Sequence, residues 1–182
     1  MGDVVLGLDV ATRTGWAING PMSGVPIVGT FKAPRPEGDK AEGFDLGPVF
    51  LAFRRWLDGM IVIHKPDTVA FEAPLNIVHG GSAKVLTNQN TIRLLFGFAA
   101  LVEMCASEHG VPTYEANVGT IKRHFAGHGR ADKAAMMARC RMLGWAVADD
   151  NQADAAALWA YVSALKNPKF SIMTTPLYGR RA

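Results

Sequence analysis

The alternation of apolar and polar residues near the N-terminus predicts three strands that follow one another closely. Residues 4–10 form an apolar run that contains one acid, Asp9, and a polar turn follows it, which is typical of a buried strand. Residues 16–18 and 25–31 are expected to be strands too, and Asn19-Gly20 between them is a hairpin signal. The sheet is therefore expected to begin with antiparallel strands.

The middle of the chain predicts two helices with one strand between them. Residues 33–47 are rich in proline, glycine and charge and predict a loop, after which a helix is expected from Pro48, because proline fits the first helical turn. Residues 68–71 predict a buried strand that Glu72 closes. After a loop at 76–82, a helix is expected over 83–108; its second half is apolar nearly all round, which predicts a central, buried helix.

The last third of the chain predicts one more strand and three helices. The strand is expected at residues 111–116, and the helices at 118–125, 132–143 and 151–165. This order of elements predicts an α/β fold with a mixed five-stranded sheet, in which three antiparallel strands precede parallel ones and helices flank the sheet. Residues 1–166 are expected to form one domain, and residues 167–182 a loosely ordered C-terminal tail.

The composition is consistent with one globular domain, and the sequence also bears on the cellular compartment of the protein. The 182 residues are 49% hydrophobic and 19% charged, ordinary values for a globular protein with one core. No uninterrupted apolar run reaches membrane-spanning length and the N-terminus lacks the features of a signal peptide, so we expect a cytoplasmic protein without membrane contact. Cys105 and Cys140 are then expected to be reduced, buried thiols.

The positive charge is concentrated in one segment. The net charge is +3, but residues 121–141 contain six lysines and arginines against the single acid Asp132. These basic residues are Lys122, Arg123, Arg130, Lys133, Arg139 and Arg141. Such a cluster suits a phosphate backbone, although each residue alone is equally typical of a solvated helix face.

Three acids stand in surroundings that are costly for a carboxylate. Asp9 lies in an apolar run, where a carboxylate must be paired, hydrogen-bonded or bound to a metal ion, and Glu72 repeats the situation at the end of its strand. Asp154 lies in an alanine-rich helix one turn after Asp150, so both can face the same way. Each acid alone is also typical of a turn, an edge or a helix N-cap, the last applying to Asp150 and Asn151. Together they predict a site for Mg²⁺ or Mn²⁺, which prefer oxygen ligands.

Three segments share an order and spacing with a known group of nucleases. They are Gly-Leu-Asp-Val-Ala-Thr-Arg-Thr-Gly-Trp-Ala-Ile at 7–18, Val-Ala-Phe-Glu-Ala-Pro at 69–74, and Asn-Gln-Ala-Asp-Ala-Ala-Ala-Leu at 151–158. They resemble RuvC-type Holliday junction resolvases of the RNase H-like superfamily, and the similarity covers roughly residues 4–165. The resemblance implies an RNase H-like fold, a homodimer, and two-metal, in-line hydrolysis that resolves four-way DNA junctions by paired nicks. The expected products carry a 5′-phosphate and a 3′-hydroxyl.

The resemblance also implies roles for single residues. Asp9, Glu72 and Asp154 match the family's catalytic acids and would bind Mg²⁺, with Mn²⁺ as a substitute. The family usually has Asp or His three residues before the last acid, where this chain has Asn151; the fourth ligand is therefore either Asp150 or Asn151.

The resemblance also implies that several basic residues contact the DNA. Lys133 matches a family lysine near the scissile phosphate, where it would stabilise charge in the transition state or position the phosphate. Lys122 matches a second basic position, and Arg123, Arg130 and Arg93 are further candidates for DNA contacts. The family often has an aromatic residue just after the second acid; this chain has Ala-Pro-Leu-Asn-Ile there, which leaves open how it would open a junction.

Three other functions compete with junction resolution. An RNase H-like nuclease could instead cut other branched DNA, flaps or RNA–DNA hybrids, because the acids set the chemistry while surface shape sets the substrate. A DNA-binding module without catalysis is disfavoured by the three intact acids. Actin-like, ATP-binding sugar kinases have phosphate loops that also begin Asp-x-x-Thr, but they need two such domains, and 182 residues are too few.

Overall fold

A mixed five-stranded sheet forms the centre of the computed structural model, which describes residues 3–20, 24–39, 43–74, 89–168 and 170. Its strands are β1 (Val5–Asp9), β2 (Arg13–Asn19), β3 (Pro26–Lys32), β6 (Thr68–Glu72) and β7 (Thr113–Ala116). The strand order is β3-β2-β1-β6-β7. β1, β2 and β3 pair antiparallel, whereas β6 is parallel to β1 and β7 is parallel to β6. The predicted α/β sheet is therefore confirmed.

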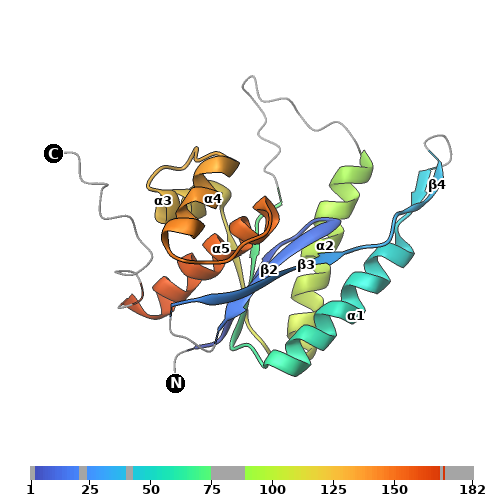
Figure 1. Cartoon of the computed structure of the whole chain (residues 1–182). Helices are drawn as coiled ribbons and strands as arrows, with labels where there is room; N and C mark the ends of the chain where they lie inside the picture. Colours follow the sequence, from blue (N-terminus) through green and yellow to red (C-terminus); the bar gives the residue numbers. More distant parts are fainter. Residues whose placement is uncertain (1–2, 21–23, 40–42, 75–88, 169, 171–182) are drawn as a thin grey trace.

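Five helices within the described residues cover the two faces of this sheet. They are α1 (Gly47–His64), α2 (Gln89–Glu108), α3 (Val118–Ala126), α4 (Lys133–Met142) and α5 (Asp150–Lys166). Figure 1 shows α1 and α2 side by side on one face, with α5, α3 and α4 on the other. The buried residues fall into two clusters, one on each side of the sheet.

Some boundaries differ from those expected. The second strand begins at Arg13, not at residue 16, because β2 pairs with β3 along its whole length, from Arg13 opposite Lys32 to Asn19 opposite Pro26. The prediction of a loop over 33–47 was wrong, since a small hairpin of β4 (Glu37–Asp39) and β5 (Gly43–Asp45) lies there. Pairing between two short strands leaves little periodicity in the sequence. The predicted loop 76–82 and the predicted helix start at 83 lie outside the described residues.

Helix α2 is less central than expected. Its buried residues lie along one side, whereas Phe96 is 50% exposed and Met104 is 42% exposed. The prediction of a buried helix was wrong because the outer side of α2 is uncovered in the single chain. Among the described residues, α2 alone is long and apolar enough to cross a membrane by length and composition, a test that core helices of globular proteins also pass. Cys105 and Cys140 are buried and free, as expected.

Small residues let α5 approach the sheet closely. In β1, Leu6 and Leu8 face α1 and α2, whereas Gly7 faces α5, and a Cβ there would lie 3.0 Å from the backbone oxygen of Ala155. At Gly15 in β2, a Cβ would lie 2.0 Å from the backbone oxygen of Asn151. Only glycine permits this contact, which brings the first turn of α5 next to the end of β1.

Candidate active site

Asp9 and Glu72 project from neighbouring strands toward α5. Each is the last residue of its strand, and the parallel register of β1 and β6 pairs Leu8 with Phe71, so the two acids follow side by side. Side chains alternate between the faces of a sheet, which puts Asp9 and Glu72 on the same face as Gly7 and Ala70, the one that α5 covers. The pairing of β1 with β6 therefore brings the first two acids together.

The first turns of α5 bring the remaining acids to this point. Asp149 is the N-cap, and its carboxylate accepts a hydrogen bond of 3.0 Å from the backbone N–H of Gln152. Gln152 in turn donates to the Thr30 hydroxyl at 3.1 Å, which ties α5 to β3. The reading of Asp150 or Asn151 as the N-cap was wrong, because both lie within the helix, with Asp150 as its first residue.

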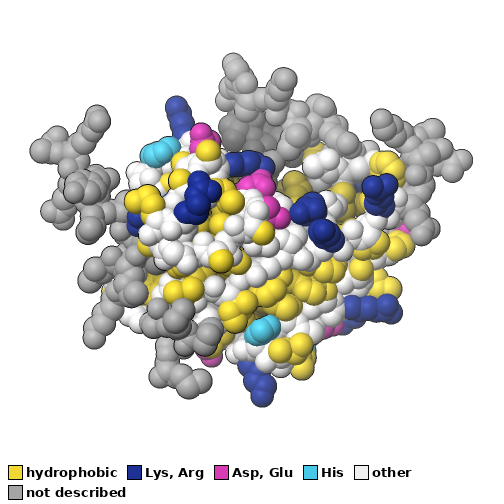
Figure 2. All heavy atoms as spheres, viewed as in Figure 1, with side chains coloured by type: hydrophobic (Ala, Val, Ile, Leu, Met, Phe, Trp, Pro, Cys, Tyr) yellow, Lys and Arg dark blue, Asp and Glu magenta, His cyan; other side chains and the backbone are white. Residues whose placement is uncertain are grey.

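These side chains meet in a pocket of about 260 Å³ at the ends of β1 and β6. The charged and amide residues that line it are Asp9, Glu72, Lys133, Asp150, Asn151 and Asp154. All six were singled out from the sequence, although they come from two strands and two helices. Figure 2 shows acidic side chains on this side of the molecule with lysine and arginine side chains around them.

Burial and mutual repulsion raise the pKa of the three inner acids. Burial, and then the charges of Glu72 and Asp154, raise the pKa of Asp9 well above its ordinary value. Burial and the Asp154 charge raise the pKa of Glu72 to about 7. Burial also raises the pKa of Asp154. A divalent cation would relieve this repulsion, and carboxylate and amide oxygens form a donor set that fits Mg²⁺ or Mn²⁺.

Two lysines act on the acids of the pocket, and one of them, Lys133, lines it. Lys133, the first residue of α4, donates from its ammonium group to a carboxylate oxygen of Asp150. The positive charge of Lys122 of α3 partly opposes the rise that burial causes in the pKa of Glu72 and Asp154. Both lysines therefore add positive charge close to the acids.

The other predicted basic residues lie further out. Arg93, Arg123 and Arg130 are exposed, and none of these described side chains lines the pocket. A cation that the sequence did not single out is Arg13, which donates to the Asp149 carboxylate at 3.2 Å. Its place in the segment 7–18 was the one signal that could have drawn attention to it.

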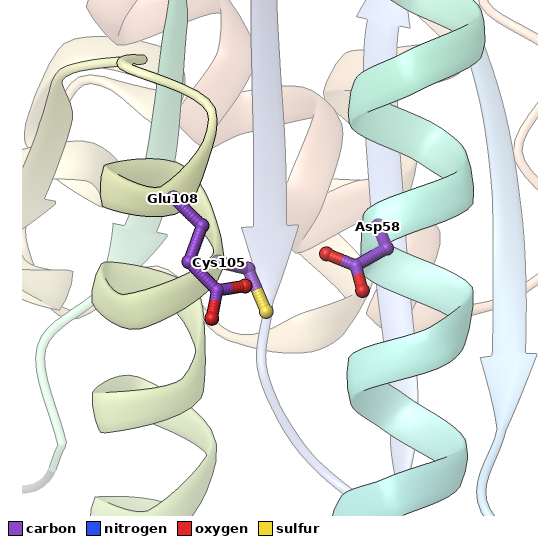
Figure 3. A group of neighbouring side chains, drawn as sticks. All are labelled: Asp58, Cys105 and Glu108. Atoms are coloured by element: carbon purple, nitrogen blue, oxygen red, sulfur yellow. The ribbon is translucent and has the colours of Figure 1, made fainter.

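A second group of metal-type side chains lies on the other face of the sheet. Asp58 on α1 and Cys105 and Glu108 on α2 have ligand atoms within 4.8 Å of one another (Figure 3). The Arg54 guanidinium donates to Glu108 at 2.8 Å, and the His109 ring lies 3.3 Å from Asp58. Burial raises the pKa of the Cys105 thiol to about 11. The two carboxylates are paired with basic side chains and the thiol is protonated. We therefore interpret this group as a salt-bridge network rather than a metal site.

Solved structures with the same fold act on DNA junctions. Thermus thermophilus RuvC in complex with a Holliday junction substrate superposes with a TM-score of 0.63 at 18% identity, covering 96% of this chain and 99% of the other. A yeast mitochondrial Holliday junction resolvase gives a TM-score of 0.59 at 11% identity, covering 93% of this chain and 79% of the other. At such identities the likeness concerns the fold, which is that of the RNase H-like α/β proteins.

Sequence relatives narrow this class to one family. The crossover junction endodeoxyribonuclease RuvC of Streptomyces coelicolor is 31% identical over 160 residues, which cover 84% of this chain and 75% of the relative. The RuvC of Oleidesulfovibrio alaskensis is 32% identical over 133 residues, 72% of each protein. No family model matches the chain. The chain belongs to the RuvC family of crossover junction endodeoxyribonucleases, as the three segments indicated.

Proposed function

We propose that the protein is a metal-dependent endonuclease that resolves four-way DNA junctions by paired nicks, which leave a 5′-phosphate and a 3′-hydroxyl. One observation carries the proposal: Asp9, Glu72 and Asp154, distant in sequence, converge in one pocket that Lys133 also lines. Relatives of the same family carry the name of this activity.

The acids are proposed to bind divalent cations. Asp9, Glu72 and Asp154 supply carboxylate oxygens, and the fourth ligand is Asp150 or Asn151, which line the same pocket. Mg²⁺ is the proposed ion and Mn²⁺ a substitute, because all the donors are hard oxygen atoms. When bound, two such ions activate water for in-line attack on a phosphodiester and stabilise the leaving 3′ oxygen.

The lysines and arginines are proposed to hold the DNA. Lys133 lines the pocket, and the charge of Lys122 acts on Glu72 and Asp154, so both would contact the phosphate at the cut, where Lys133 would also stabilise the charge that develops. Arg93, Arg123 and Arg130 are exposed and would contact the backbone further away. The backbone contacts would position the DNA without reading its sequence.

The protein is proposed to act as a homodimer. Symmetrical paired nicks need two active sites, and a single chain contributes the pocket that Asp9, Glu72 and Asp154 line. The outer side of α2 exposes the large apolar side chains of Phe96 and Met104 beside charged residues such as Arg93 and Glu103, and a second copy would cover this side. A DNA substrate agrees with the expected cytoplasmic location.

A nicking assay on four substrates tests the proposal. Synthetic four-way junctions, flaps, RNA–DNA hybrids and plain duplex are incubated with the protein and Mg²⁺, and strands labelled at their 5′ ends are resolved on denaturing gels. We expect symmetrical nicks on the junction, and a loss of at least about 100-fold in Asp9→Asn. Asp3→Asn, the same change on an exposed carboxylate 3.6 Å from Lys166, is the matched control and should cut like wild type.

Two outcomes would contradict the proposal. A protein that cuts flaps or hybrids but leaves the junction intact would be a nuclease with another substrate. Cutting by Asp9→Asn at the wild-type rate would show that the acidic pocket does not catalyse the cleavage.

A further inference from the structure

The two acids at the start of α5 each hold a different cation. Asp149 pairs with Arg13 at 3.2 Å, and Asp150 pairs with Lys133. The two helix starts that meet here are fixed by their own caps. Asp149 caps α5, and Asp132 caps α4 by accepting from the backbone N–H of Ala135 at 2.8 Å. Neither helix therefore needs the contact between Asp150 and Lys133 in order to form.

Asp150 differs from the three inner acids in its surroundings. The inner acids lie against the sheet, whereas the ion pair of Asp150 and Lys133 is open to solvent, with side chains 31% and 76% exposed. One carboxylate oxygen of Asp150 is already occupied by an ammonium group. To bind Asp150, a divalent cation would have to displace this ammonium group or be coordinated by the other carboxylate oxygen alone.

We propose that Asp150 is a positioning residue, which holds the ammonium group of Lys133 over the pocket, and that it is not a ligand of the bound cations. The long side chain of Lys133 is otherwise mostly solvated, and Asp150 is the one described residue that accepts a hydrogen bond from it. Holding the ammonium at the rim places it beside an incoming phosphate, at a lower cost in side-chain entropy. The inference rests on the proposed nuclease function and assigns the fourth ligand position to Asn151.

A double-mutant cycle measures whether Asp150 acts through Lys133. Nicking of the junction is followed at saturating Mg²⁺ in wild type, Asp150→Asn, Lys133→Ala and the double variant. Since an exposed ion pair is weak, we expect Asp150→Asn to lower kcat by about fivefold with an unchanged KM. In the Lys133→Ala background, the same change should lower kcat by less than about twofold.

Asp149→Asn provides the matched control. It removes one negative charge from the same helix end, but asparagine still caps the helix and the lost partner is Arg13, not Lys133. Its effect should therefore be the same with and without Lys133. An equal coupling in both cycles would mean that the helix end responds to total charge, and would overturn the proposal.

Mn²⁺ binding, measured by calorimetry without DNA, tests the second part of the proposal. We expect Asp150→Asn to bind Mn²⁺ with a Kd within about twofold of the wild-type value, whereas Asp154→Asn should weaken binding by at least about tenfold. A tenfold loss in Asp150→Asn would make Asp150 a ligand and overturn the proposal. Failure of the proposed function looks different: the wild type then leaves the junction intact, while calorimetry still decides whether Asp150 binds the ion.

Discussion

Glu72 should destabilise the folded protein at neutral pH when no metal ion is bound. Burial and the Asp154 charge raise its pKa from 4.5 to about 7 in the folded state. At about 1.4 kcal/mol per pKa unit, this rise corresponds to roughly 3 kcal/mol for keeping the carboxylate charged in the folded protein. Glu72→Gln removes the charge and keeps the shape, so it should stabilise the metal-free protein.

The sign of the effect depends on pH. Between about pH 4.5 and 7 the folded state binds a proton that the unfolded state has released, so the metal-free protein loses stability as pH rises through this window. Glu72→Gln should therefore raise the melting temperature by about 5–10 °C at pH 8, and by much less at pH 5. The Glu72 charge also raises the pKa of Asp9, so its removal relieves that acid as well.

Thermal unfolding followed by circular dichroism in EDTA, at pH 5 and pH 8, checks this expectation. Glu115→Gln, the same change at an exposed position of β7, is the control and should shift stability by less than about 0.5 kcal/mol. Added Mn²⁺ should give the wild type a higher melting temperature than Glu72→Gln, because the ion stabilises the wild type more than a variant that lacks one ligand. A variant less stable than the wild type at pH 8 in EDTA, or an equal gain at both pH values, would refute the reasoning.

Two further predictions concern the packing of α5 and the basic rim. Gly15→Ala places a Cβ 2.0 Å from the Asn151 backbone oxygen, so it should lower the free energy of unfolding by at least about 2 kcal/mol and weaken Mn²⁺ binding. Gly59→Ala, with nothing within 4 Å, should instead stabilise α1 by about 0.5–1 kcal/mol; equal effects of the two changes in denaturant unfolding would contradict the packing argument. Lys122→Ala should weaken binding to all DNA shapes alike and lower the slope of log Kd against log salt by about 1, measured by fluorescence anisotropy. Lys166→Ala, at the far end of α5, should leave that slope unchanged, and a similar change in both variants would show that Lys122 has no special place at the DNA.

Much of the fold can be predicted from the sequence because the relevant signals are local. Apolar residues at strand or helix spacing indicate which side of an element is buried, and this spacing predicted the strands of the main sheet and the helices that the described residues form. Asp9 and Glu72 could be singled out for the same reason, as acids at the ends of apolar strands. The hairpin of β4 and β5 escaped prediction because short pairs leave little periodicity.

The tertiary structure decided which residue at the start of α5 caps the helix and which acid pairs with which cation. By sequence, Asp150 and Asn151 were the N-cap candidates, and Asp149, the residue before them, was not singled out. Contact with Gly15 sets where the helix meets the sheet, and the cap then falls on Asp149. Asp150 faces Lys133 across 17 positions of sequence, and Arg13 reaches Asp149 across 136.

The sequence by itself thus determined the elements and the acids, and the tertiary structure decided which polar groups meet. The physical reason is the range of each interaction. Burial of a strand or helix face leaves a pattern within a few residues, whereas the partner of a charge depends on how distant segments pack. In this protein that packing depends on glycines at positions 7 and 15, which let one alanine-rich helix lie directly on the sheet and bring Asp154 to Asp9 and Glu72.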